Sequence, residues 1–161
     1  MPAPVLSPGA QGQPQGGIPS PANVDQSDAS AVSRGALTAL HTYDTTLDTS
    51  RNDAGRRTAA AGWCTEAYAS QLNEAASHAV PGAVWAEWAQ HKAYTKVTLQ
   101  QTEDAGRPLD SLTTAYRQWT VTVTPTGRDG WSGPPEVRTV YAELTRATPA
   151  QPWRLNSIRI V

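Results

Sequence analysis

The sequence predicts an α+β fold in which N-terminal helices pack on a curved, four-stranded antiparallel sheet. Apolar residues repeat at helical spacing up to about residue 88, and from residue 92 onward they alternate at the spacing of strands. The helical and strand segments are not interleaved, which is typical of α+β domains. A chain of 161 residues is long enough to form one domain with a full hydrophobic core.

The N-terminal segment has the composition of a linker. Residues 1–24 hold six Pro and four Gly, and their larger apolar side chains are Val5, Leu6, Ile18 and Val24. Such a low apolar content cannot offset the entropy lost on ordering. We therefore expect a disordered, Pro/Gly-rich linker over residues 1–26 and a single α+β domain over residues 27–161. A spacer behind a membrane anchor and an ordinary disordered terminus share this composition.

Two long helices and one short helical turn are expected before the sheet, at residues 28–48, 53–77 and 84–88. Ser27 or Asp28 is the expected N-cap of the first helix. Gly35 lies in the middle of that helix, where it costs up to about 1 kcal/mol relative to Ala and leaves room for another backbone. The inner face of the second helix should carry Ala61, Cys64, Tyr68, Leu72 and Ala75.

Four strands are expected, at residues 92–103, 111–124, 136–146 and 153–161. The last strand breaks strict alternation, which predicts a β-bulge near Asn156 and Ser157. The tryptophans that lie in apolar patterns are expected in the core: Trp85, Trp88, Trp119 and Trp153. Trp131 lies in a Gly- and Pro-rich hairpin loop, where it either forms an exposed contact for a protein partner or folds back onto the sheet.

Composition and charge exclude several classes of function. A net charge of −1 and a pI near 6.3 give no basic surface for nucleic acid. Cys64 is the only cysteine, so neither an intramolecular disulfide nor a cysteine-based zinc site is expected, and we expect it to be buried. No apolar run reaches 18 residues. Eleven Arg against two Lys, with no Phe, indicate a GC-rich genome such as that of an actinobacterium.

Five side chains are candidates for a chemical role. His41 should face solvent beside Asp44, with which it can pair on the helix surface. His78 should cap the end of the second helix. His91 starts the first strand and is the best candidate base of the three, although an edge position is favoured. Arg117 is expected to face inward, either stacked on an aromatic ring or beside an unidentified carboxylate.

Motifs for common catalytic reactions are absent from the sequence. It has no phosphate-binding Gly-rich loop ending in Lys-Ser/Thr, no Gly-x-Ser-x-Gly elbow and no His-Glu-x-x-His helix. We therefore assign no catalytic residue, no cofactor and no metal ligand, and we expect that the protein is not an enzyme.

The order of elements and three local phrases resemble the nuclear transport factor 2-like (cystatin-like) fold. The phrases are Tyr43–Asp48 closing the first helix, Trp85-Ala86-Glu87-Trp88 before the first strand, and the closing Trp153-Arg154-Leu155 with Ile158. Within that fold the chain is similar to extracytoplasmic domains of TcpC/TraM-type conjugation proteins, which belong to type IV secretion. The resemblance covers residues 28–161. It implies a cone-shaped α+β domain that acts through protein contacts.

Three functions follow from this resemblance. The preferred one is a non-enzymatic scaffold domain of a membrane-anchored conjugation or type IV secretion component, which contacts other proteins of a membrane complex or further copies of itself. The second is a small-molecule enzyme or binder of the polyketide-cyclase or ketosteroid-isomerase type, which needs a pocket of about 300–1,000 Å³ between helices and sheet. The third is an exported accessory domain of another transport pathway. The expected location is the extracytoplasmic face of the membrane, through an anchor outside this sequence, or else the cytoplasm.

Overall fold

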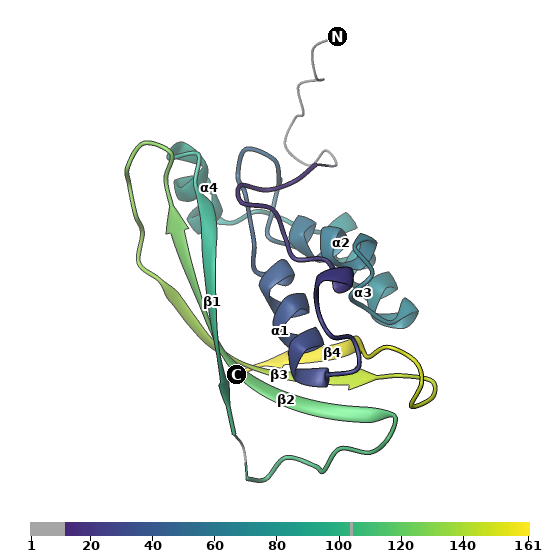
Figure 1. The fold of residues 1–161 in the computed structure, drawn as a ribbon. Helices are drawn as coiled ribbons and strands as arrows, with labels where there is room; N and C mark the ends of the chain where they lie inside the picture. Colours follow the sequence, from purple (N-terminus) through teal and green to yellow (C-terminus); the bar gives the residue numbers. More distant parts are fainter. Residues whose placement is uncertain (1–11, 104) are drawn as a thin grey trace.

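The computed structural model describes residues 12–103 and 105–161, and within them a short 3-10 turn at Pro21–Asn23 precedes four helices and four strands. The helices are α1 (Ala29–Leu40), α2 (Asn52–Ala60), α3 (Glu66–Ser77) and α4 (Ala83–Gln90). The strands are β1 (Tyr94–Thr102), β2 (Thr114–Thr126), β3 (Glu136–Thr145) and β4 (Arg154–Ile160). The predicted α+β fold, with helices N-terminal to an antiparallel sheet, is confirmed (Figure 1).

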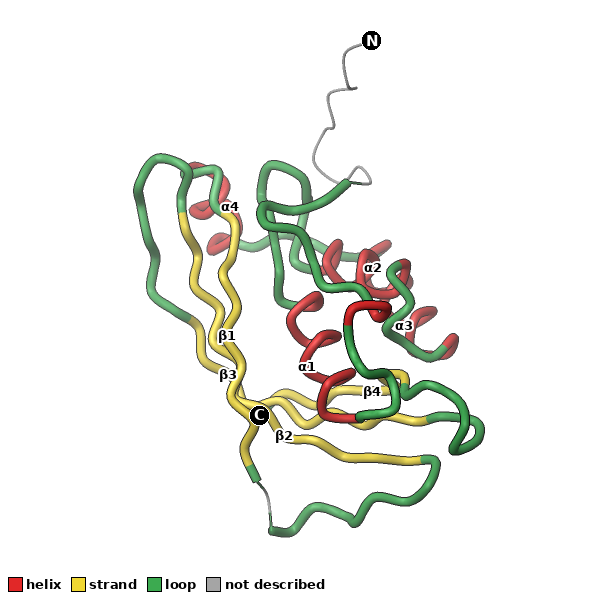
Figure 2. Tube along the Cα trace, in the orientation of Figure 1, coloured by secondary structure: helices red, strands yellow, loops and turns green. Residues whose placement is uncertain are grey.

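The sheet is open and strongly bent, with strand order β1-β2-β3-β4 and antiparallel pairing throughout. Helix α1 lies in the hollow of the bend and contacts all four strands, while α2 and α3 pack on its far side (Figures 1 and 2). The concave face is apolar because alternate residues of the central strands point toward α1. Its fully buried members include Trp119, Val121, Val123, Val140 and Leu144.

The bulge lies where the sequence predicts it. Glu143 pairs with Ser157 and Leu144 pairs with Leu155, so Asn156 is the extra residue on β4. The extra residue restores the inward orientation of Ile158 after Leu155, because a shift of one position exchanges the two faces of a strand.

Helix α1 is shorter than predicted, since it ends at Leu40 and residues 41–51 form a loop. Its N-cap is Asp28, whose side chain accepts bonds from the backbone N–H groups of Ser30 and Ala31. At the other end, Asp44 and Asp48 accept hydrogen bonds from nearby backbone N–H groups. Such local side-chain bonds compete with helical hydrogen bonds, which explains why the helix does not continue to residue 48.

The second predicted helix is two helices, α2 and α3, separated by residues 61–65. Gly62 adopts a left-handed conformation with φ +93°, which suits glycine and ends α2. Thr65 then caps α3 by accepting a bond from the N–H of Tyr68. Between them, Leu155 of β4 donates to the carbonyl of Trp63 and accepts from the N–H of Thr65, both at 2.9 Å. The predicted continuous inner face is therefore wrong, because tertiary bonding to the sheet replaces a helical turn.

Trp63, in this break, is one of two tryptophans that are fully buried among the described residues, the other being Trp119. The ring of Trp63 lies against Gly35 of α1, where an added Cβ would collide with it. The space predicted at Gly35 is thus filled by a side chain rather than by a backbone. The four tryptophans assigned to the core are confirmed there, at 1–7% exposure: Trp85, Trp88, Trp119 and Trp153.

Part of the predicted linker is packed on the domain. The carbonyl of Pro19 accepts a bond from the indole N–H of Trp63 at 3.0 Å, and that of Gln26 accepts one from the N–H of Trp153 at 3.0 Å. Pro14 and Pro21 are buried. Composition underestimates how much of this segment packs on the domain. Its backbone carbonyls form hydrogen bonds and its proline rings are buried, and neither contact requires a large apolar side chain. Residues 1–11 of the predicted linker lie outside the described residues.

None of the helices in the described ranges combines the length and the apolar character that crossing a bilayer requires.

Candidate functional site

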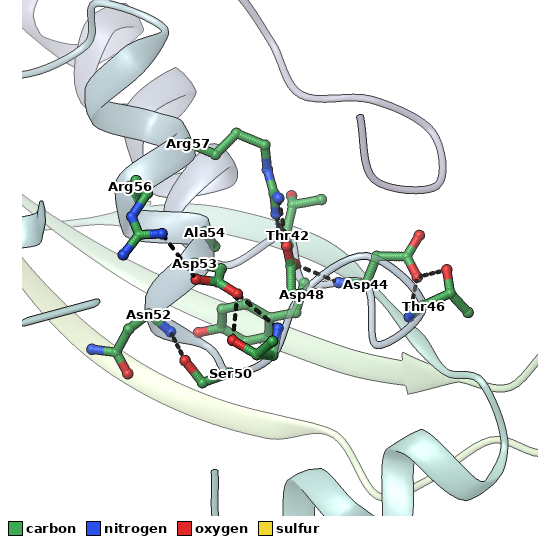
Figure 3. Close-up of polar contacts among 12 residues, drawn as sticks. Thr42, Asp44, Thr46, Asp48, Ser50, Asn52, Asp53, Ala54, Arg56 and Arg57 are labelled. Carbon is green, nitrogen blue, oxygen red and sulfur yellow. Dashed lines mark hydrogen bonds and ion pairs between the residues drawn. The ribbon is translucent and has the colours of Figure 1, made fainter. Parts of the chain in front are cut away.

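The α1–α2 loop, residues 41–51, is built around two buried aspartates (Figure 3). Asp48 accepts a bidentate pair of bonds from Arg57 of α2, at 2.7 and 3.0 Å, and a third bond from the N–H of Asp44. Arg57 also donates to the carbonyl of Thr42 at 2.9 Å. The three bonds from Arg57 hold the loop against α2, and the bond between Asp44 and Asp48 closes a turn within the loop.

Asp44 joins three distant segments of the chain. It accepts bonds from Arg128 of the β2–β3 loop at 2.8 and 3.0 Å, and from the backbone N–H of Gln15 at 2.9 Å. Burial by itself would raise the pKa of Asp44, but the bonds from Arg128, Gln15 and Thr46 outweigh it and lower the pKa. Arg128 also lies over the Tyr94 ring at 5.1 Å, which fixes its position at the start of β1. The N-terminal segment, the α1–α2 loop and the β2–β3 loop therefore meet at one carboxylate.

Trp131 lies beside this junction, in the loop between β2 and β3. Its ring stacks on the imidazole of His91 with centroids 4.1 Å apart and planes 3° apart. Asp129 accepts bonds from His91 at 2.7 Å and from the backbone N–H of Trp131 at 3.0 Å, and these two contacts lower the pKa of Asp129. Trp131 is half-buried against the hydrophobic core. Part of the Trp131 surface therefore remains exposed. We name the surface around it the Trp131 site, and it consists of His91, Arg128, Asp129, Trp131 and Ser132.

The predicted candidates for chemistry do not form a constellation. His91 caps the C-terminus of α4 and pairs with Asp129, so it does not point into the hollow of the sheet. Arg117 does point toward α1, where it donates to Ser30 at 2.8 Å and pairs with Asp110 of the β1–β2 loop at 2.8 Å. The carboxylate beside Arg117 is thus Asp110. Asp110 lies in a loop whose sequence has neither a motif nor a periodic pattern, so the sequence does not reveal it as the partner of Arg117.

The predicted exposure of His41 is wrong, because its side chain is only 3% exposed. The prediction extended the helix through residue 48, whereas α1 ends at Leu40 and the chain turns back toward the sheet. Its Asp44 neighbour is also buried, and Asp44 pairs with Arg128 rather than with His41. His78 does lie at the C-terminal end of a helix, exposed and 3.0 Å from Glu74.

Cys64 is half-buried in the α2–α3 break rather than on a helix. Burial raises the pKa of its thiol to about 12, so the thiolate needed for reactivity is scarce at neutral pH. In the described part of the chain, no three His, Cys, Asp or Glu side chains are grouped as metal ligands.

An ion cluster inside the concave face escaped the sequence analysis. Arg51 donates two bonds to Glu136 of β3, at 2.6 and 2.9 Å, and stacks over the Trp88 ring at 4.5 Å. Arg138 contacts the same carboxylate at 3.3 Å. The bonds from Arg51 are the main reason that the pKa of Glu136 is lowered. Strand alternation places Glu136 and Arg138 on the inward face with Val140, and that alternation was the available signal.

The hollow between helices and sheet is largely filled by side chains. A cavity of ≈180 Å³ remains there, between α2–α3 and β3–β4. It is smaller than the pocket of about 300 Å³ or more that an enzyme of the cyclase type requires. A larger cavity of ≈380 Å³ lies on the opposite, convex face under the β1–β2 loop, where Tyr116, Tyr141, Glu143 and Arg159 line it.

Comparison with solved structures gives a match to an IcmL-like type IV secretion system protein from Legionella pneumophila. The two chains superpose with a TM-score of 0.52 over 90% of this chain and 94% of the other, at 13% sequence identity. This chain has the fold of a type IV secretion protein. At such low identity the likeness concerns the fold alone. No protein family and no curated protein matches the sequence.

The structural match bears on the resemblance stated above. It supports the link to type IV secretion proteins at the level of the fold. The narrower assignments, to the nuclear transport factor 2-like superfamily and to TcpC/TraM-type proteins, stay predictions.

Proposed function

We propose that this chain is a non-enzymatic interaction domain of a conjugation or type IV secretion apparatus. The observation that carries the proposal is the shared fold, over nine-tenths of both chains, with an IcmL-like type IV secretion system protein. The filled hollow of the sheet supports a role in contacts rather than turnover. Its partners would be other proteins of a membrane complex, on the extracytoplasmic side, reached through an anchor outside this sequence.

The Trp131 site is our choice for the contact surface. A half-buried Trp with a fixed ring loses little entropy on binding, and Trp is enriched among residues that dominate interfaces. The stack on His91 and the bonds that His91 and the backbone N–H of Trp131 donate to Asp129 hold the ring in place before any partner arrives. A partner would meet a preformed surface, since the loop is also tied down through Arg128 and Asp44.

Photo-cross-linking in cells tests this proposal. A photoreactive amino acid at Ser132, next to Trp131 and exposed, should give adducts with another protein of the transfer apparatus. The same amino acid at Glu74, exposed on α3, is the matched control and should give none. Mass spectrometry identifies the adduct. Equal labelling from both positions, or adducts only with proteins outside the transfer apparatus, would refute the proposed surface.

The functional counterpart is the substitution Trp131→Ala in the full-length protein. Transfer of DNA or protein between cells should fall at least about tenfold, because removal of an interface anchor costs about 2 kcal/mol or more of binding. The matched control His78→Ala should transfer normally. Circular dichroism of both variants separates loss of contact from loss of folding.

A further inference from the structure

The ≈180 Å³ cavity opens between α2–α3 and the concave face of β3–β4. Polar side chains reach it from the α1–α2 loop, from α2 and α3, and from β3. The lining residues used below are His41, Tyr43, Arg51, Arg138, Ile158 and Ile160. The space is large enough for several water molecules, or for the end of a short aliphatic acid.

His41 lines this cavity, and one of its two ring nitrogens has no hydrogen-bond partner in the described ranges. Its Nδ1 lies 2.7 Å from the carbonyl oxygen of Leu37, which can only accept, so Nδ1 carries the hydrogen. In the neutral ring Nε2 is then a bare acceptor, and no side chain or backbone group in the described ranges bonds to it. The residue is only 3% exposed, but Nε2 keeps some contact with solvent, so a ligand in the cavity that His41 lines can approach it.

The cavity carries a net positive charge. Arg51 and Arg138 contribute two positive charges and Glu136 one negative charge, which leaves +1 with a neutral His41. Arg51 has its guanidinium occupied by Glu136 and by the Trp88 ring. Arg138 makes one long contact of 3.3 Å to Glu136, so most of its donors have no partner in the described part of the chain.

We propose that this cavity binds a carboxylate through Arg138 and His41. Arg138 donates hydrogen bonds to the ligand, and His41 takes up a proton and donates from Nε2 as the ligand enters. Ile158 and Ile160 give the cavity an apolar wall for a short aliphatic chain. A free small acid and the carboxylate of a peptide share this chemistry. The proposal does not depend on the proposed function.

Proton uptake gives the site a defined pH dependence. In the free protein burial lowers the pKa of His41, opposed by the bond to Leu37 and aided by the charges of Arg138 and Arg51, while Glu136 raises it slightly. A bound carboxylate raises that pKa because it favours the imidazolium. Binding therefore takes up at most one proton, and affinity should weaken by up to about tenfold per unit of rising pH between the free and bound pKa values. Tyr43 also lines the cavity but stays neutral there, since burial raises its pKa.

Nuclear magnetic resonance titration of the whole chain tests the proposal with 4-methylpentanoate as the probe. The acid should shift the His41 ring signals and raise its pKa, whereas the matched amide, 4-methylpentanamide, should not. Arg138→Gln should weaken binding at least about tenfold, as expected for loss of a hydrogen bond to a charged group. Arg138→Lys, which keeps the charge, should retain part of the affinity.

Arg159→Gln is the matched control, because Arg159 faces the convex side and stacks on Tyr141. A short peptide with a free C-terminal leucine, compared with its amide, separates the two sources of carboxylate: tighter binding than 4-methylpentanoate identifies a peptide, and weaker binding identifies a free acid. Equal binding of acid and amide, an unchanged His41 pKa, or full affinity in Arg138→Gln would each overturn the proposal.

Discussion

Gly35 and Trp63 show how a single residue decides the packing of the helices. The glycine has no Cβ, and the six-membered ring of Trp63 occupies the space where one would be. Trp63 is completely buried, and its indole N–H donates a hydrogen bond to the carbonyl of Pro19 in the N-terminal segment. The ring therefore cannot shift without breaking contacts on two sides.

Gly35→Ala should destabilise the protein by about 1–3 kcal/mol, the usual cost of overpacking a core. The helix propensity of Ala favours the variant by up to about 1 kcal/mol, so the clash must outweigh this gain. Gly82→Ala is the matched control, because open space surrounds its position. Urea denaturation measures both. A Gly35→Ala variant as stable as the wild type would show that Trp63 is free to move.

The α1–α2 loop illustrates the same dependence at the scale of an element. Two consecutive arginines of α2 face different surroundings: Arg57 pairs with Asp48 with side chains 12% and 1% exposed, whereas Arg56 is 46% exposed and 4.0 Å from Asp53. A buried carboxylate that loses its partner keeps its desolvation cost, while an exposed pair contributes little. The neighbouring residues thus form a natural comparison.

Arg57→Ala should lower the free energy of unfolding by about 3–5 kcal/mol, and Arg56→Ala by at most about 1 kcal/mol. Guanidinium denaturation followed by circular dichroism provides both values. If the two variants were equally stable, the loop would not be held by Asp48.

Acid should loosen the same region. The pKa values of Asp44 and Glu136 are lowered in the folded protein, so the unfolded chain binds these protons more readily. Their stabilisation is complete above the ordinary values, 3.8 for Asp and 4.5 for Glu, and is lost as pH falls below them. The midpoint temperature of thermal unfolding should therefore decrease as the pH is lowered from 7 to 3. Arg128→Gln removes the partner of Asp44 and should flatten this slope, whereas an unchanged slope would contradict the assignment.

Sequence patterns located the strands better than the helices. Alternation in a half-buried strand is a local signal, and it gave the four strands and even the extra residue at Asn156. The ends of α1 and the break before α3 depend on partners far along the chain, such as Leu155 for Trp63. The burial of His41 follows from that misplaced helix end. Among site residues, Trp131 stood out by its loop, but its stack on His91 joins segments 40 residues apart, which no local pattern reveals.

At the scale of the whole molecule, three helices fill the concave side of a bent sheet that remains open at both edges. The aromatic residues of α4 extend this core beyond the bend, where Trp85 and Trp88 meet Tyr43. Because side chains fill the hollow, and because binding residues often lie on loops that a packed scaffold positions, we assign the proposed contact surface to the loops.

A crystal structure of this chain that resolves ordered water would test whether side chains fill the hollow between the helices and the sheet. We expect Leu37, Trp63 and Trp119 to fill the hollow, with water confined to the small cavity at His41. A wide, water-filled hollow lined by His91, Arg117 and a carboxylate would contradict it, and would favour an enzyme.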